Sequence, residues 1–169
     1  MPPLHIAPLQ YTDLVDVLPF LMGARGMMFP KLEGSPLPTD LAQLQSVYQQ
    51  NSSCLLLARQ DGKLVGTIGY LPYDGRFANI AYPGLRTVEV VRLFVAPGHR
   101  RGGVARSLWL ALLEHAKANG QQVLYLHTHP FLAGAIDFWQ RQGFELLQVD
   151  PDPVWQTTHM QLRLVDRGS

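Results

Sequence analysis

The run TVEVVRLFV at residues 87–95, with the turn that follows it, constrains the fold of this chain more than any other feature. β-Branched residues dominate the run, which favours a strand, and Ala96-Pro97-Gly98 ends it. Beyond the turn, apolar residues recur at helical spacing over residues 104–119, before Gly120. This order predicts a strand, a turn rich in glycine and arginine, and a helix within a mixed α/β domain.

The flanking sequence predicts further strands and helices around this unit. Residues 54–59 and 64–73 are apolar runs joined through Asp61-Gly62, which indicates a hairpin of antiparallel strands. Thr12 is predicted to cap a helix that Pro19 interrupts or ends, because proline lacks the N–H that a helix interior requires. Other strands are predicted at 4–8, 122–128, 144–148 and 159–164, and other helices at 40–50, capped by Thr39, and at 133–142.

Length and composition indicate one globular domain. The chain has 169 residues, 47% of them hydrophobic and 16% charged, with a net charge of +1. We therefore expect a single domain over residues 1–169 and no nucleic-acid partner. No apolar run approaches the roughly 20 residues of a membrane span, and the lone Cys54 cannot form an internal disulfide. The expectation is a protein of the reducing cytoplasm, neither secreted nor inserted in a membrane.

The turn PGHRRGGVARSL predicts a phosphate site. A helix that opens near Gly103 directs unpaired N–H groups into one concavity, and the absence of side chains at Gly102 and Gly103 lets a diphosphate approach the backbone. Positive charge comes from Arg100, Arg101 and Arg106. The spacing fits neither a Walker A loop nor G-x-G-x-x-G, so nucleotide hydrolysis and hydride transfer lose their main support. An ordinary glycine-rich turn with solvated arginines is the alternative that this segment leaves open.

Three segments in order resemble the GNAT superfamily, the GCN5-related N-acetyltransferases. Arg100-x-x-Gly103-x-Ala105 is similar to its Q/R-x-x-G-x-G/A signature, which binds the pyrophosphate of acetyl-CoA. Residues 89–95, EVVRLFV, resemble its E-[IV]-x-x-L-x-V strand, and residues 135–144, AIDFWQRQGF, resemble its A-x-x-F-Y-x-x-x-G-F segment. The N-terminal part of the chain carries almost no such signal.

The resemblance implies a mixed, mostly antiparallel sheet of about six to seven strands with a central splay, flanked by about four helices. It places a CoA-binding core at residues 87–144 and acceptor-side elements at 1–86 and 145–169. It implies transfer of an acetyl group from acetyl-CoA, as co-substrate, to a primary amine by direct attack in a ternary complex, with no metal. The CoA contacts that it assigns are Leu93, Phe94, Val95, Arg100, Arg101, Gly102, Gly103, Val104, Ala105, Arg106 and Trp139.

A general base is also implied, because an ammonium has no lone pair with which to attack a thioester. Glu89 corresponds to the position where several members of the family place a glutamate base. Strand alternation puts it on one face with apolar residues, and desolvation there predicts a raised pKa. Those neighbours are Val91, Leu93 and Val95. The alternative is an exposed carboxylate or one paired with Arg86 or Arg92.

Trp139 stands where many members of the family have a tyrosine that protonates the departing thiolate. Indole cannot serve as that acid, so Trp139 packs either against pantetheine or in the core. Tyr125 and Tyr82 are weaker candidates for the acid. A second departure is Leu132, where the family often has an asparagine.

Acceptor choice is expected at residues 20–38 and 73–86, which carry few acids and would rim the cleft opposite CoA. Their apolar members are Phe20, Met27, Met28, Phe29, Phe77 and Tyr82. We interpret the acceptor as a small-molecule, amino-acid or peptide amine rather than a polycation. The same residues equally suit a closed core or an oligomer interface, which leaves a homodimer open.

His127 and His129 share one face of a predicted strand, with no third metal ligand close in sequence. They would serve as acid or base if they line the acceptor pocket. Two rival interpretations remain: a catalytically silent acyl-CoA-binding or regulatory module, and a protein that binds another phosphate ligand at the turn.

Overall fold

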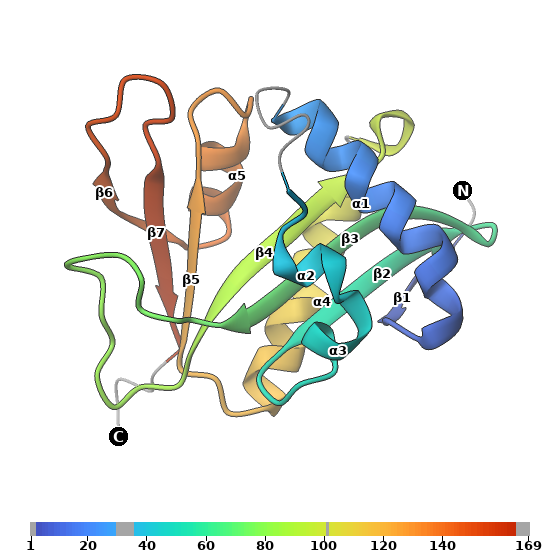
Figure 1. The fold of residues 1–169 in the computed structure, drawn as a ribbon, viewed down its shortest axis with the longest axis horizontal. Helices are drawn as coiled ribbons and strands as arrows, with labels where there is room; N and C mark the ends of the chain where they lie inside the picture. The colour runs from blue at the N-terminus through green and yellow to red at the C-terminus, as the bar shows by residue number, and fades with distance from the viewer. Residues whose placement is uncertain (1–2, 30–35, 101, 165–169) are drawn as a thin grey trace.

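The computed structural model describes residues 3–29, 36–100 and 102–164. Their strands form one seven-stranded sheet in the order β1-β2-β3-β4-β5-β7-β6, in which β4 and β5 pair in parallel and the other neighbours are antiparallel (Figure 1). The strands are β1 (Leu4–Pro8), β2 (Cys54–Gln60), β3 (Lys63–Pro72), β4 (Thr87–Val95), β5 (Val123–Thr128), β6 (Glu145–Val149) and β7 (Thr158–Arg163). The helices are α1 (Leu14–Met28), α2 (Thr39–Ala42), α3 (Leu44–Tyr48), α4 (Val104–Ala118) and α5 (Ala135–Arg141). The predicted mixed, mostly antiparallel sheet is confirmed.

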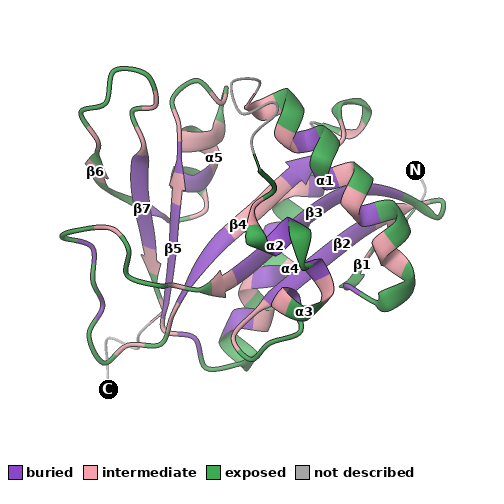
Figure 2. Ribbon diagram, in the orientation of Figure 1, coloured by how far each residue is buried: buried purple, intermediate pink, exposed green. Residues whose placement is uncertain are grey.

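Helices cover both faces of the sheet's central strands. α4 lies on one face, and α1, α2 and α3 lie on the other (Figure 1). In β2, Leu56 and Ala58 pack in the core under α4, whereas Leu55 and Leu57 pack in the core under α1. This double coverage explains why residues 54–58 are apolar without alternation, and why the centre of the sheet is buried (Figure 2).

The sheet splays at its centre. β4 pairs with β5 only over Thr87–Glu89 and Val123–Tyr125. Beyond that point β4 runs on to Val95 along β3, while β5 runs on along β7 (Figure 1). The predicted central splay is therefore present, and it leaves one side of β4 without a paired strand after Glu89.

Two helices differ from the sequence predictions. α1 continues through Pro19, and the carbonyl that the proline leaves without a helical partner belongs to the exposed Val15, where water can replace the lost bond. The helix predicted over residues 40–50 is two short helices, because Gln43 adopts a non-helical conformation, φ −130° and ψ 50°. Thr39 is the first residue of α2 rather than its cap.

A bulge in β4 changes the predicted alternation. Arg92 has φ 58°, and the register with β3 shifts between Thr67 and Gly69. After the bulge, Leu93 and Val95 pack in the core under α4, whereas Val91 packs on the opposite face. The prediction that Leu93 and Val95 share a face with Glu89 is therefore wrong.

Gly69 in β3 lies where there is no room for a side chain. A Cβ there would lie 2.6 Å from the Cys54 carbonyl oxygen, which is too close for any real contact. We expect Gly69→Ala to lower the free energy of unfolding by roughly 1–3 kcal/mol in urea titrations. The same change at Gly23, an exposed α1 position with no atom within 4 Å, is expected to raise it by about 0.5–1 kcal/mol. Equal effects at the two sites would contradict this account.

Candidate active site

A cleft of about 1230 Å³ opens where β4 and β5 separate. One wall is the unpaired side of β4, and the other is β5 with the segment that leads into α5. The predicted CoA residues that line it are Leu93, Phe94, Val95, Arg100, Ala105 and Trp139. The end of α1 and the segment after β3 complete its rim through Met27, Met28, Phe29, Asp74 and Arg76.

The glycine-rich turn opens α4 at the edge of this cleft. Gly103 precedes the helix with φ 81°, and no atom lies within 4 Å of where its Cβ would be. Gly102 is likewise exposed, so both backbones are open to an incoming group. The side chain of Val104 is buried in the core, which leaves only its backbone for a ligand. Arg106 is exposed and is not among the residues that line the cleft.

Arg100 is exposed, but contacts within the turn hold its side chain. Its Nε donates to the Val95 carbonyl oxygen at 3.1 Å, and its guanidinium lies 5.5 Å from the centre of the Phe94 ring. Arg101, which was also predicted to contact CoA, lies outside the described residues.

Trp139 packs in the core and also reaches the cleft. It is buried and packs edge-to-face on Trp109, with ring centroids 5.5 Å apart, and on Phe144 at 5.1 Å. It also lines the cleft. The indole therefore fixes the α5 wall of the cleft to the core under α4.

Glu89 is a buried carboxylate with two basic neighbours. Arg76 donates to both of its oxygens, at 2.7 and 2.9 Å, and His127 Nδ1 lies 3.4 Å from Oε2. Burial raises the pKa of Glu89, but His127 and Arg76 oppose it and lower the pKa from 4.5 to about 2. The predicted rise in pKa is therefore wrong, since burial came with a cationic partner.

The partner of Glu89 is neither of the two arginines named from sequence. Arg92 instead forms a two-point contact with Asp40, at 2.8 and 2.7 Å, and Tyr48 donates to the same carboxylate at 2.7 Å. Burial raises the pKa of Asp40, but Arg92 outweighs it and the pKa is lowered. Arg76 had no sequence signal, because it lies in the irregular segment after β3.

His127 is the titratable group best placed to reach a ligand. It lines the cleft from β5, and its side chain is 29% exposed. Its Nδ1 is buried on the side of Glu89 and lacks a hydrogen bond, so the exposed part of the ring is turned away from the carboxylate. Glu89 and His127 thus form a carboxylate–imidazole pair at the point of the splay.

The tyrosines named as acid candidates do not reach the cleft. Tyr125 is fully buried with its hydroxyl 2.5 Å from His159 Nδ1, and His159 Nε2 lies 3.1 Å from Asp150. Burial, with the charge of Glu89, raises the pKa of Tyr125. Burial raises the pKa of Tyr82 to about 12. Neither is among the residues that line the cleft.

The rim contains only part of the set named from sequence. Phe20 packs on Phe94 with ring centroids 5.2 Å apart, and Phe77 and Tyr82 pack in a third apolar cluster with Tyr125. Those three residues do not line the cleft. Phe131 lines it, and Trp155 packs on Phe131; both were missed, since each lies in a loop with no periodic pattern.

His127 and Arg76 together lower the pKa of Glu89, and removal of Arg76 should show its share. Because the folded pKa lies below 4.5, the ion pair stabilises the fold above that pH, and its contribution is lost as pH falls toward about 2. Arg76→Gln is expected to lower the free energy of unfolding by roughly 1–3 kcal/mol at pH 7, and by less at pH 3. It should also raise the pKa of Glu89, measured by carboxyl NMR. The exposed Arg141→Gln is the control, and a pH-independent loss would contradict the ion-pair explanation.

Among the described residues, no group of three or more histidine, cysteine or acidic side chains is arranged to hold a metal ion. In the same part of the chain, no helix is long and apolar enough to cross a bilayer.

The splayed sheet, the glycine-capped helix at its mouth and the cleft between them define a domain of the N-acetyltransferase class. Residues 21–144 match the model of the acetyltransferase (GNAT) family, and the chain belongs to that family. Human N-acetyltransferase 8 is 31% identical over 112 residues, which are 64% of this chain and 46% of that protein. The chain spans about half the length of the curated relatives it matches.

Solved structures share the fold at low sequence identity. A GNAT-family acetyltransferase from Staphylococcus aureus superposes with a TM-score of 0.75 at 17% identity, over 96% of this chain and all of that one. An aminoglycoside 6′-N-acetyltransferase solved with coenzyme A gives a TM-score of 0.70 at 16% identity, over 96% of this chain and 98% of its own. These similarities establish the fold.

Proposed function

We propose that this chain is an acetyl-CoA-dependent N-acetyltransferase that acylates a primary amine by direct attack in a ternary complex. The observation that carries the proposal is the cleft that begins at the β4–β5 splay and has Arg100 and Ala105 of the glycine-rich turn in its wall. A pantetheine arm could pair with the free side of β4 along Leu93–Val95 as an added strand. Its pyrophosphate would then meet the N–H groups at Gly102 and Gly103, where the helix dipole favours an anion.

Proton removal is assigned to the Glu89–His127 pair, with His127 as the base. A carboxylate with a pKa of about 2 and two hydrogen bonds from Arg76 is a weak proton acceptor at neutral pH. His127 presents part of its ring to the cleft, and Glu89 lies behind it, where an anion stabilises an imidazolium. Glu89 is therefore a positioning residue that acts through His127.

The acyl transfer balances with these groups. The acceptor ammonium gives one proton to His127, and its nitrogen lone pair forms a bond to the thioester carbon. The carbon–sulfur bond then breaks, the CoA thiolate leaves with its electron pair, and the nitrogen loses its second proton to solvent to give the neutral amide. Backbone N–H groups of β4 are candidates to stabilise the oxyanion. The indole of Trp139 cannot act as an acid toward the departing thiolate, so solvent protonates the thiolate.

The test is release of free CoA thiol from acetyl-CoA with a panel of small-molecule, amino-acid and peptide amines. Thiol release that depends on an amine supports the enzyme. Tight CoA binding by calorimetry with no turnover on any amine would favour the silent acyl-CoA-binding module instead. Equal binding of nucleotides and CoA would favour a site for another phosphate ligand.

The cytoplasmic location of the protein and its assembly into a homodimer stay predictions. Cys54 is free and buried, and burial raises the pKa of its thiol to about 12, which suits a structural thiol in a reducing cytoplasm. A homodimer is tested by sedimentation of the purified chain.

A further inference from the structure

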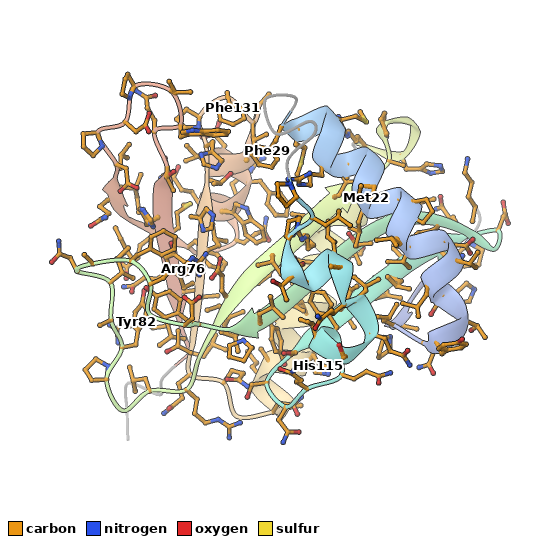
Figure 3. The ribbon with its side chains drawn as sticks, in the orientation of Figure 1. Met22, Phe29, Arg76, Tyr82, His115 and Phe131 are labelled. Carbon is orange, nitrogen blue, oxygen red and sulfur yellow. The ribbon has the colours of Figure 1, made fainter. Side chains whose placement is uncertain are left out.

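Four aromatic rings meet at the mouth of the cleft, and we refer to them as the aromatic cluster: Phe29, His129, Phe131 and Trp155. Phe29 lies 5.7 Å from His129, 5.9 Å from Phe131 and 6.2 Å from Trp155, measured between ring centroids. His129 stacks on Phe131 at 5.0 Å with an angle of 15° between the rings. Figure 3 shows Phe29 and Phe131 close together beyond the end of α1. Three distant segments thus build one aromatic surface.

The aromatic cluster carries no charge. His129 Nδ1 lies 3.0 Å from the Trp155 carbonyl oxygen, and because a carbonyl only accepts, this nitrogen holds the hydrogen. Burial lowers the pKa of His129, which favours the neutral ring. The cluster is therefore an apolar surface with a neutral imidazole at its centre.

The aromatic cluster faces the cleft beside the proposed base. Phe29, His129 and Phe131 line the cleft, and the ring centroid of His129 lies 6.1 Å from that of His127. Phe131 is 48% exposed and Met27, which also lines the cleft, is 56% exposed, although both are large apolar side chains. Apolar surface left open in a cleft next to reactive groups is typical of a ligand-binding wall.

Each described acid in the cleft lining has an arginine partner. Among its described lining residues, Asp40 is paired with Arg92, and Arg76 is paired with both Asp74 and Glu89. The remaining arginine, Arg100, lies at the CoA end and donates to a backbone carbonyl. Arg76 thus serves two carboxylates. Beside the aromatic cluster, the described lining presents no carboxylate without an arginine partner and no arginine without an acid partner.

We propose, on the basis of the function proposed above, that the acceptor is a primary monoamine with an aromatic body and no carboxylate. Its amine lies against His127 and its ring lies on the aromatic cluster. Burial of one aromatic ring there should favour 2-phenylethylamine over propylamine by roughly 10- to 100-fold in kcat/KM. Phenylalanine and spermidine should be poor acceptors, because the carboxylate of the first would find no arginine without an acid partner there, and the further cations of the second would find no carboxylate without an arginine partner.

The experiment compares these four amines by thiol release from acetyl-CoA, with the intact chain and with Phe131→Ala. Phe131 is half exposed, so its removal should leave the fold intact; Phe29→Leu is the second variant. We expect Phe131→Ala to lower kcat/KM for 2-phenylethylamine by roughly tenfold and to leave propylamine nearly unchanged. Tyr11→Ala removes a ring that is 70% exposed and absent from the cleft lining, and it should change neither.

Failure of the proposed function and failure of the aromatic-acceptor proposal give different results. If no amine releases thiol, the proposed function is wrong and this inference falls with it. If propylamine, phenylalanine or spermidine is used as well as 2-phenylethylamine, or if Phe131→Ala affects both monoamines equally, the enzyme stands and the aromatic acceptor is wrong.

Discussion

Replacing His127 with glutamine is expected to lower kcat for amine acetylation by roughly 100-fold and to leave the affinity for CoA unchanged. The change keeps a polar side chain of similar reach but removes the lone pair that accepts the amine proton. The affinity for CoA should hold, because His127 is not among the predicted CoA contacts and Glu89 remains paired with Arg76. Steady-state rates and calorimetry separate the two effects.

The matched control is His5→Gln, an exposed histidine in β1 that is not among the residues lining the cleft. Glu89→Gln should also lower kcat, because the imidazolium loses the anion behind it. Wild-type turnover by His127→Gln, together with a large loss in Glu89→Gln, would return the base role to Glu89.

The pH dependence of kcat/KM offers a second way to separate these roles. With a pKa of about 2, Glu89 is ionised throughout the range in which the protein is assayed, so a Glu89 base produces no acid limb there. An imidazole base must be neutral to accept the amine proton, so its own protonation produces an acid limb. We expect the wild-type profile to fall on the acid side and the limb to disappear in His127→Gln.

Local patterns in the sequence predict the framework of the CoA side. β4, the turn and α4 follow from a β-branched run, a breaker and a helical repeat, all within one continuous stretch. The β2–β3 hairpin follows from Asp61-Gly62, which have φ values of 52° and 75°, as the turn requires. These features depend on neighbours in sequence, and the sequence predicts them correctly.

The electrostatics of the site could not be predicted in the same way. The sequence correctly indicates that Glu89 is buried, but its partner Arg76 comes from an irregular segment whose path has no periodic signal. The contacts of Glu89 with His127 and Arg76 reverse the direction of the pKa shift. The bulge at Arg92 could not be predicted either, because it depends on a contact between strands. Thr67 in β3 donates to the Arg92 carbonyl oxygen at 2.7 Å.

Gly103→Glu is expected to weaken CoA binding by more than roughly 100-fold. The space around the missing Cβ is open, so a glutamate there would extend toward the N-terminus of α4. A carboxylate at that point would occupy the proposed pyrophosphate site and repel it; a unit charge at about 4 Å near a protein surface is worth up to about 4 kcal/mol. Calorimetry with CoA measures the effect directly.

Two controls separate charge from backbone strain. Gly103→Gln has the same shape and the same φ of 81°, so the difference between the two variants reports the charge. Gly62→Glu introduces the same acid at φ 75° in the β2–β3 hairpin, again with no atom within 4 Å of the Cβ position, and should bind CoA as the unaltered chain does. If Gly103→Glu and Gly103→Gln bind CoA equally well, no anion lies at this turn. The pyrophosphate would then have to lie elsewhere along the cleft, and the arginines of the turn would be solvated, as the alternative interpretation holds.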